Sequence, residues 1–366
     1  MDKLGIGILG YGGFARFLHQ SWSQLDEVAV VAAADSRAEA NPGDMRFYDD
    51  WRKLAEDPDV AIVAIASPPA THAGLAVSLM QAGKHLLVEK PVSLSAEADS
   101  ERLLHARDKA GIVVAVNHML RFHPLLETFQ SWVRDGTYGP LRHASVENYA
   151  QDETLPPDHW FWDREQSGGI LIEHAVHFID LVDTLAAAPV VRVTGAAADR
   201  STGQRDRVLA SVEYEDGLVA THYHHFSGLN SFEETHIRLA FDKLRMRLHG
   251  WIPTYGHLHA LVDEATYELI QALPNWTERT LAPLDDGKAR HFAATGESYS
   301  ATHEVFGTFR MDQSKMEVYA DLVRASMLDV VKAVRDASHK VRVPLEIGLS
   351  TVDVAERATK SAVTRD

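Results

Sequence analysis

Hydrophobic residues in the first third of the chain come in short continuous runs, separated by stretches with helical spacing. The runs cover Leu4–Leu9, Val28–Ala34, Val60–Ala66, Leu86–Val88 and Ile112–Val116. The stretches between them, such as 14–25 and 71–82, are amphipathic. Apolar strands that alternate with helices indicate a parallel sheet covered on both faces. In such a sheet, ligands bind beyond the carboxyl ends of the strands.

After about residue 120 the apolar segments become longer, and several alternate with polar residues. Expected strands cover Leu141–Tyr149, Val190–Ala198, Val208–Tyr214, Leu218–Phe226, Glu234–Phe241 and Lys243–Gly250. Expected helices cover Gly169–Leu185, Ser314–Ser338 and Gly348–Ser361. Alternation of this kind is typical of antiparallel strands with one exposed face. The stretch from Pro253 to Thr308 is rich in His, Pro and polar residues, and its pattern predicts no definite element.

Composition narrows the choice of partners and chemistry. A length of 366 residues suggests two domains, and the net charge of -16 argues against nucleic acid or a membrane surface as a partner. The absence of cysteine excludes thiolate nucleophiles, iron–sulfur clusters and cysteine-type zinc sites. The first residues lead directly into a strand-like run without a signal-peptide pattern, and no apolar stretch is long enough to span a bilayer. A cytoplasmic location is therefore expected.

A glycine motif follows the first apolar run and opens a helix. Residues 10–15 fit G-x-G-x-x-G/A, the pattern of dinucleotide-binding turns in this context. Gly10 permits the tight turn, Gly12 lets the backbone approach a pyrophosphate, and Ala15 allows close packing of helix on strand. The alternative is a glycine-rich turn that only packs tightly. The motif predicts an NAD or NADP site.

Asp35 ends the second run, where a carboxylate can accept hydrogen bonds from the adenosine ribose and would repel a 2′-phosphate. This favours NAD. Arg37 leaves NADP open, because its guanidinium could pair with that phosphate.

Two further segments carry candidate chemistry. Lys90 follows the fourth run in Glu89-Lys90-Pro91, where an ammonium could stabilise developing alkoxide charge on a substrate. On an expected helix, Glu173, His177 and Asp180 are spaced to share one face. A carboxylate one turn from a histidine can orient it as a proton acceptor near neutral pH. Taken alone, this second pattern favours a histidine packed in a structural helix.

In order and spacing, these motifs resemble the Gfo/Idh/MocA oxidoreductases, the family of glucose–fructose oxidoreductase and inositol dehydrogenase. The resemblance covers nearly the whole chain. Besides the glycine motif, it rests on the segments Ala66–His72, Ala82–Pro91, Arg121–Pro124, Trp162-Asp163, Gly168-Gly169 and His177–Asp180.

The resemblance implies an α/β protein with an N-terminal Rossmann domain, over residues 1–120, that binds NAD or NADP. Residues 121–366 would form an α/β domain for substrate binding and oligomerisation, with a large, open, mostly antiparallel sheet. The last helix could pack back on the Rossmann domain. Pairing of the exposed sheet faces would give a homodimer or homotetramer, because open sheet faces are costly unless covered.

The expected cofactor-binding residues are Gly10, Gly12, Gly13, Phe14, Ala15, Asp35, Arg37, Ser67, Pro68, His72, Glu89, Lys90 and Asn117. The expected substrate-binding residues are Lys90, Arg121, Trp160, Trp162, Glu173, His174 and His177.

The resemblance also implies catalytic roles for Lys90, His177 and Glu173. His177 would remove the hydroxyl proton of a sugar, sugar acid or cyclitol, Lys90 would hold the oxygen, and Glu173 would steady the imidazole. Glu173 stands where members commonly carry Asp, and His174 stands where a small or apolar residue is usual. His174 could face the edge of the pocket or the domain interior.

Other functions remain open from the sequence. A redox-cycling lyase or glycosidase with tightly held NAD would use the same residues. A non-catalytic nucleotide- and sugar-binding regulator would have no need of both Lys90 and His177. His222 and His224 share a strand face, but no resident metal is expected.

Overall fold

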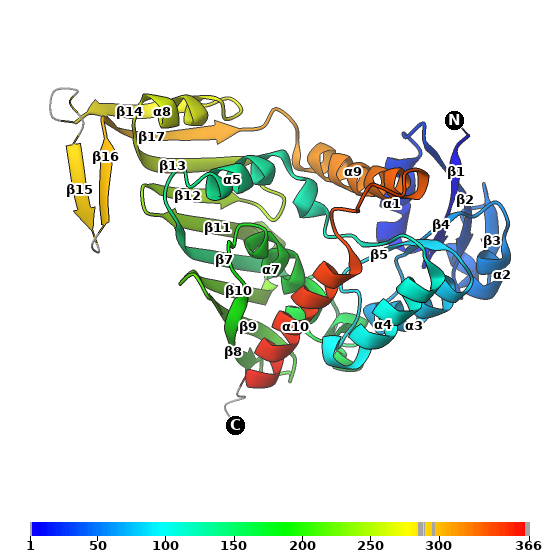
Figure 1. Cartoon of the computed structure of the whole chain (residues 1–366). Helices are drawn as coiled ribbons and strands as arrows, with labels where there is room; N and C mark the ends of the chain where they lie inside the picture. The colour runs from blue at the N-terminus through cyan, green and yellow to red at the C-terminus, as the bar shows by residue number, and fades with distance from the viewer. Residues whose placement is uncertain (1, 285–287, 289, 295–296, 363–366) are drawn as a thin grey trace.

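The computed structural model describes residues 2–284, 288, 290–294 and 297–362. The first part of the chain builds a parallel sheet of 6 strands in the order β3-β2-β1-β4-β5-β6 (Figure 1). The strands are β1 (Leu4–Leu9), β2 (Val28–Ala34), β3 (Arg46–Tyr48), β4 (Ile62–Ile65), β5 (His85–Val88) and β6 (Val114–Val116). This order reverses direction at β1, and the predicted Rossmann topology is confirmed. Strand β3 was not predicted, because three residues carry too little pattern.

Helices connect these strands and cover the sheet. They are α1 (Gly13–Trp22), α2 (Trp51–Glu56), α3 (Pro69–Gln81) and α4 (Ala96–Ala110), with a short turn, η1 (Ala38–Ala40). Side chains from β4 and β5 are almost completely buried because helices cover both faces. Helix α4 ends at Gly111, whose φ of 64° gives the left-handed turn that closes a helix.

The second sheet has 9 strands in the order β14-β17-β13-β12-β11-β7-β10-β9-β8. Its strands are β7 (Leu141–Gln151), β8 (Val190–Asp199), β9 (Arg205–Tyr214), β10 (Val219–Gly228), β11 (Glu234–Phe241), β12 (Leu244–His249), β13 (Tyr255–Val262), β14 (Thr277–Pro283) and β17 (His303–Arg310). Strands β7 and β10 are parallel and the other pairs are antiparallel, so the expected mostly antiparallel sheet is confirmed. The segment 253–308, which the pattern left unassigned, supplies three of these strands, helix α8 (Glu264–Gln271) and the hairpin β15 (Arg290–Ala294) and β16 (Glu297–Ala301).

The remaining helices join the two sheets. Helices α5 (Pro124–Arg134), α7 (Val176–Asp183) and α10 (Leu345–Ser361) lie on one face of the large sheet (Figure 1). Helix α9 (Lys315–Arg335) returns to the first sheet beside α1, where the Trp22 indole donates to the Val323 carbonyl at 3.0 Å. Shorter helical segments are η2 (Met119–Phe122), η3 (Trp160–Trp162), α6 (Arg164–Ser167), the π-helical turn η4 (Leu171–Ala175) and η5 (Asn230–Phe232).

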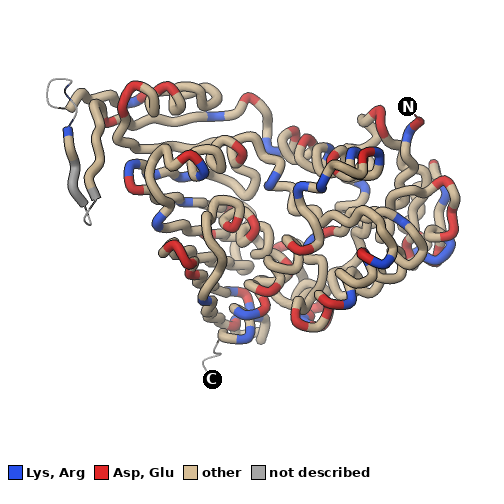
Figure 2. The backbone as a smooth tube through the Cα atoms, viewed as in Figure 1, with Lys and Arg blue, Asp and Glu red and all other residues tan. Residues whose placement is uncertain are grey.

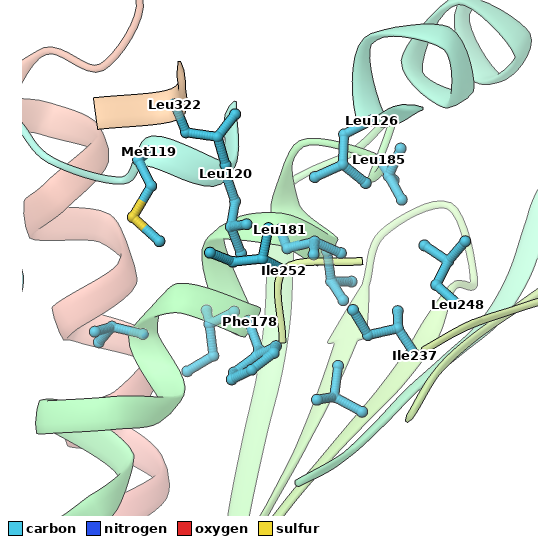
Figure 3. Packing of buried hydrophobic residues seen from close by; sticks show 14 of the residues in the cluster. Met119, Leu120, Leu126, Phe178, Leu181, Leu185, Ile237, Leu248, Ile252 and Leu322 are labelled. Atoms are coloured by element: carbon cyan, nitrogen blue, oxygen red, sulfur yellow. The ribbon is translucent and has the colours of Figure 1, made fainter. Parts of the chain in front are cut away.

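A continuous buried cluster connects the two halves. Figure 3 shows side chains from η2, α9, α7 and the large sheet meeting in one packed region, among them Met119, Leu322, Phe178 and Ile237. Helix α7 is therefore held between the large sheet and the end of strand β6. This packing fixes the position of the residues that precede and begin α7.

Charged residues of both signs are distributed over the whole backbone (Figure 2). In the part of the chain that the structure describes, no helix is both long and apolar enough to cross a membrane.

Candidate active site

A cavity of about 1010 Å³ opens at the carboxyl ends of β1, β2 and β4. Its lining includes Gly10, Gly12, Gly13, Phe14, Ala15, Asp35, Arg37, Ser67 and Pro68, which are nine of the residues expected to bind a cofactor. Helix α1 begins at this cavity, and its N-cap Gly12 makes no side-chain cap hydrogen bond. The first amides of α1 and the positive end of its dipole are thus available to a phosphate.

Gly10 is needed for the shape of this turn. Its φ is 86°, and a Cβ at this position would lie 2.6 Å from the backbone nitrogen of Ser67. Around Gly13, in contrast, a Cβ would meet nothing within 4 Å. Glycine therefore closes β1 tightly against the end of β4 and leaves an open backbone surface toward the cavity. This cradle fits the pyrophosphate of a dinucleotide.

Asp35 accepts four hydrogen bonds, one of them from the Arg37 amide to Oδ1 at 2.9 Å. Its Oδ2 accepts hydrogen bonds from the Tyr11 amide at 2.8 Å and from Arg37 Nη2 at 2.9 Å, and its Oδ1 accepts from Arg37 Nε at 3.0 Å. Burial raises the pKa of Asp35, but the hydrogen bonds from Arg37 and Tyr11 outweigh burial and leave it below the ordinary value. From the sequence, Asp35 favours NAD and Arg37 leaves NADP open. In the structure the two side chains form one bidentate ion pair at the cavity wall.

His72 contacts two loops next to the cavity. Its Nδ1 and Nε2 lie 2.7 Å from the carbonyl oxygens of Pro91 and Ser67, and the side chain is buried. The ring therefore links the loops that follow β4 and β5, whereas the sequence predicts that it contacts the cofactor directly. The Lys90–Pro91 peptide bond between these loops is cis.

Glu89 and Asn117 lie at the ends of β5 and β6. The Asn117 side-chain amide donates to Glu89 Oε1 at 2.6 Å. Burial raises the pKa of Glu89 to about 7, although the bond from Asn117 and the charge of Lys90 oppose the shift. Neither residue lines the cavity described above, so a contact with the cofactor stays a prediction for both.

Lys90 forms the central ion pair of the site. Its Nζ donates to Glu173 Oε1 at 2.9 Å and to the Glu173 carbonyl oxygen at 2.7 Å. Both side chains are mostly buried, with 14% and 15% of their surfaces exposed. Burial raises the pKa of Glu173, but the charge of Lys90 outweighs it and keeps the carboxylate ionised. An ammonium has three N–H donors, so one remains for a substrate oxygen.

His177 lies close to this pair and is held neutral. Burial, followed by the nearby Lys90 charge, lowers the pKa of His177 well below its ordinary value. Its Nδ1 is buried and has no hydrogen-bond partner among the described residues. The sequence predicts that Glu173 orients this imidazole; in the structure Glu173 bonds Lys90 instead.

The helix that carries these residues also departs from the expected regular geometry. Residues 171–175 are wound more widely than an α-helix, whereas the expected common face of Glu173, His177 and Asp180 assumes 3.6 residues per turn. Glu173 is engaged by Lys90, and Asp180 has a different partner, since its Oδ1 accepts from Arg121 Nε at 2.8 Å.

Of the other predicted substrate residues, Trp160, Trp162 and Arg121 line cavities, and His174 lies beside His177. Trp160 lines the cofactor cavity, and Trp162 lines a separate cavity of about 460 Å³ beside α6. Arg121 is committed to Asp180 and lines a third cavity near the start of β8. His174 packs against His224 and Phe226, with ring centroids 5.5 and 4.9 Å away. Direct substrate contact by these residues stays a prediction.

Three residues of this region were not predicted from the sequence as part of the site. The Trp251 ring lies 6.2 Å from that of His177 and 4.9 Å from that of Tyr319 on α9. His118 packs edge-on against His177, with the centroids 6.3 Å apart. These residues come from separate parts of the chain, and no local motif marks them. Among the described residues, no three His, Asp or Glu side chains are grouped as a metal site would require.

These features define a dinucleotide-binding protein of the Rossmann type, with a lysine–glutamate pair and a neutral histidine beside the carboxyl ends of its strands. Residues 4–118 match the family described as oxidoreductase family, NAD-binding Rossmann fold, and residues 126–250 match the GFO/IDH/MocA C-terminal domain. The two matches together cover well over half of the chain, and the chain belongs to the Gfo/Idh/MocA oxidoreductase family.

Curated relatives include the scyllo-inositol 2-dehydrogenase (NAD(+)) of Bacillus subtilis (strain 168), 27% identical over 59% of this chain and 64% of that enzyme. The UDP-N-acetylglucosamine 3-dehydrogenase of Acidithiobacillus ferrooxidans is 28% identical over 60% of this chain and 66% of that enzyme. The chain spans only 56% to 64% of the length of three curated relatives, one of which is the inositol dehydrogenase.

Among solved structures, an oxidoreductase domain protein from Kribbella flavida has a TM-score of 0.76 at 19% identity, over 99% of this chain and 97% of that chain. This likeness shows that the whole fold is shared.

Proposed function

We propose that the protein is an NAD(P)-dependent oxidoreductase that interconverts a hydroxyl and a carbonyl on one carbon of a sugar, sugar acid or cyclitol. The observation that carries the proposal is the Lys90 ammonium, which is fixed by Glu173 with one donor left over, next to the neutral His177. The names of the inositol and sugar-nucleotide dehydrogenases among the relatives support the substrate class.

A bound nicotinamide would supply the hydride chemistry, and the glycine cradle with Asp35 would hold the dinucleotide. The residues of the chain would do the rest. Lys90 binds the substrate oxygen and stabilises its negative charge. His177 accepts the hydroxyl proton at Nε2, because its Nδ1 is enclosed. Since the imidazole is neutral, it is ready to accept a proton at neutral pH.

Cofactor choice is the finer part of the proposal. We expect NAD to be preferred, because the Asp35 carboxylate occupies the position that a 2′-phosphate would approach. Arg37 is half-exposed, but its guanidinium is engaged with Asp35.

The first experiment is to follow reduced-nicotinamide absorbance with NAD and NADP over a panel of inositols, aldoses, sugar acids and their keto forms. Lys90→Ala serves as the blank, because it keeps the dinucleotide cradle. Turnover that disappears in the variant is expected. Cofactor binding without net turnover of any panel member would contradict the proposal and favour the redox-cycling lyase first, or the regulator.

The proposed assembly is a homodimer or homotetramer formed through the open face of the large sheet. On β11 and β12 the alternate side chains that do not face the buried core include His236 and His249, whose rings are 5.2 Å apart. Tyr149 and Tyr223 stand 5.6 Å apart on the neighbouring strands. Tyrosine side chains are enriched in protein interfaces. A light-scattering mass of one 40.6 kDa chain would contradict this assembly. The cytoplasmic location stays a prediction from the sequence.

A further inference from the structure

His118 lies beside His177, for which the sequence predicts a carboxylate partner. It follows β6, is completely buried, and presents its ring at 82° to the His177 ring. Glu173 makes no hydrogen bond to His177 Nδ1 in this arrangement, and its carbonyl oxygen and Oε1 accept from Lys90. The base therefore needs another partner for its enclosed nitrogen.

The tautomer of His118 is fixed by its neighbour on α10. The Thr351 hydroxyl donates its only hydrogen to the Gly348 carbonyl oxygen at 2.9 Å. The contact of 3.1 Å between His118 Nε2 and Thr351 Oγ1 must therefore have the histidine as donor. Burial lowers the pKa of His118 to about 3, so the ring is neutral and its Nδ1 carries a lone pair and no hydrogen.

The two histidines are left with matching unpaired atoms. Nδ1 of His118 and Nδ1 of His177 are both buried, and neither has a hydrogen-bond partner in the described part of the chain. If Nε2 of His177 faces the substrate as an acceptor, its single hydrogen resides on Nδ1. An unpaired buried N–H costs about 1–3 kcal/mol. The centroid separation is about 1 Å longer than that of two imidazoles joined by an N–H···N bond of about 3 Å.

We propose that His118 is the positioning residue for His177, accepting a hydrogen bond from His177 Nδ1–H at its own Nδ1. The bond fixes the tautomer in which His177 Nε2 is free to accept a proton, and it stabilises the imidazolium that forms when the substrate hydroxyl gives up its proton. Thr351 acts one step further away by keeping His118 an acceptor. The inference rests on the proposed function, because it takes His177 as the base.

His174 is the competing partner. Its Nε2 is also buried without a partner, and its ring centroid is 6.4 Å from that of His177. Within the described part of the chain, no hydrogen bond fixes its tautomer as Thr351 fixes that of His118. Replacement of each histidine separately distinguishes the two.

The first test needs no substrate. In the protein labelled with ¹⁵N-histidine, NMR at pH 7 should show His177 as a single Nδ1–H tautomer and His118 as Nε2–H. His118→Phe should give His177 a mixture of both tautomers, whereas His118→Asn should preserve Nδ1–H, because the amide oxygen can accept in the same place. Thr351→Val, which leaves both rings intact, should mix the tautomers of His118. An Nε2–H tautomer of His177 in the unaltered protein would overturn the proposal, as would an unchanged His177 spectrum in His118→Phe.

The second test is kinetic, with the best substrate of the polyol panel. His118→Phe should lower kcat about 10- to 100-fold with KM nearly unchanged, and His118→Asn should recover most of the loss. His222→Phe, which replaces a buried histidine outside the proposed site, should retain kcat, and His174→Phe is measured beside it. A kcat loss confined to His174→Phe would transfer the role to His174. If no substrate turns over while the NMR result holds, the pairing of the two rings stands and the proposed reaction fails.

Discussion

The side chain of Glu173 is one methylene longer than the Asp that the family resemblance leads us to expect at this position. The longer carboxylate reaches the lysine ammonium, with which it forms a bond of 2.9 Å, and the carbonyl of the same residue forms a second bond. A lysine held at two points has lost most of its rotational freedom before a substrate arrives. Pre-organised charge of this kind is effective because little reorganisation is needed during the reaction.

Replacement of Glu173 by Gln should weaken both structure and chemistry, because it leaves the buried ammonium without an ionised partner. We expect the free energy of unfolding to fall by about 1–3 kcal/mol and kcat/KM to fall about 10- to 100-fold. Urea unfolding and steady-state kinetics measure the two effects. Glu346→Gln makes the same chemical change at the exposed pair with Arg107 and should alter stability by less than about 0.5 kcal/mol. If both variants changed the free energy of unfolding and kcat/KM equally, the Lys90–Glu173 pair would contribute no more than an exposed ion pair.

Asp35 and Arg37 should decide cofactor preference together. Asp35→Asn removes the charge that repels a 2′-phosphate and releases Arg37, so the ratio of NADH to NADPH affinity should fall about 10- to 100-fold. Arg37→Met should weaken NADPH more than NADH. Fluorescence titration of each reduced cofactor gives the Kd values. If neither variant changes the ratio of NADH to NADPH affinity, Asp35 and Arg37 do not discriminate between a 2′-hydroxyl and a 2′-phosphate.

At the level of elements, the sequence predicted the strands better than the reactive geometry. The runs at 4–9 and 28–34 coincide with β1 and β2, because fully buried strands leave continuous apolar runs. The alternating segment at 234–241 coincides with β11 for the related reason that one face is buried. The π-helical turn at 171–175 has no such signature, since it depends on how the segment packs. The expected helix was present, but the partners of its carboxylates were not predicted, since Glu173 bonds Lys90 and Asp180 bonds Arg121.

The β1–α1 turn offers a controlled test of backbone strain. Gly10→Ala places a Cβ 2.6 Å from the backbone of Ser67 at a φ of 86°. Gly43→Ala has a similar φ of 81°, but nothing lies within 4 Å of its Cβ. The Gly43 variant should lose about 1 kcal/mol of stability, and the Gly10 variant about 1–3 kcal/mol more. Thermal and urea unfolding compare them, with cofactor affinity expected to fall in the Gly10 variant alone. Equal losses would mean that the turn relaxes freely around an added methyl group.

For the molecule as a whole, buried neutral histidines link stability to pH. His222 and His224 on β10 are completely buried, and none of their ring nitrogens has a partner among the described residues. Burial lowers the pKa of His222 to about 4 and that of His224 well below its ordinary value. An unfolded histidine titrates near about 6.5. Below that pH the unfolded chain takes up protons that the folded chain refuses, so stability is lost as the pH falls from 6.5 toward 4.

His222→Leu should therefore flatten the acid side of the stability profile. At pH 7 the variant should be at least as stable as the unaltered protein, because two unpaired ring nitrogens are removed. Below pH 6 its advantage should grow by about 1.4 kcal/mol per pH unit, up to about 3 kcal/mol near pH 4. Urea midpoints measured at several pH values test this. His105→Gln, on the exposed side of α4, removes a histidine without the effect. Parallel profiles for His222→Leu and the unaltered protein would exclude His222 as a source of acid sensitivity.

The arrangement of the two sheets was predicted mainly through the family resemblance. Motif order indicated the Rossmann sheet and the position of Lys90, but partners distant in sequence were beyond local patterns. Trp251, Tyr319 and His118 meet around His177 only after α9 and α10 have packed. Arg121 was expected to bind substrate because of its residue type. Its ion pair with Asp180 depends on a tertiary contact that the sequence does not show.

The contact between α9 and α1 can form only late in synthesis, because the two helices are far apart in the sequence. The Trp22 indole and the Val323 carbonyl that accepts its hydrogen bond are 301 residues apart. At a synthesis rate of about 5–20 residues per second, the ribosome needs on the order of 15 to 60 seconds to supply that partner. During this interval the dinucleotide-binding half carries an uncovered apolar flank around α1. A nascent chain of this protein should therefore be a client of chaperones that recognise exposed apolar surface, until its last helices emerge.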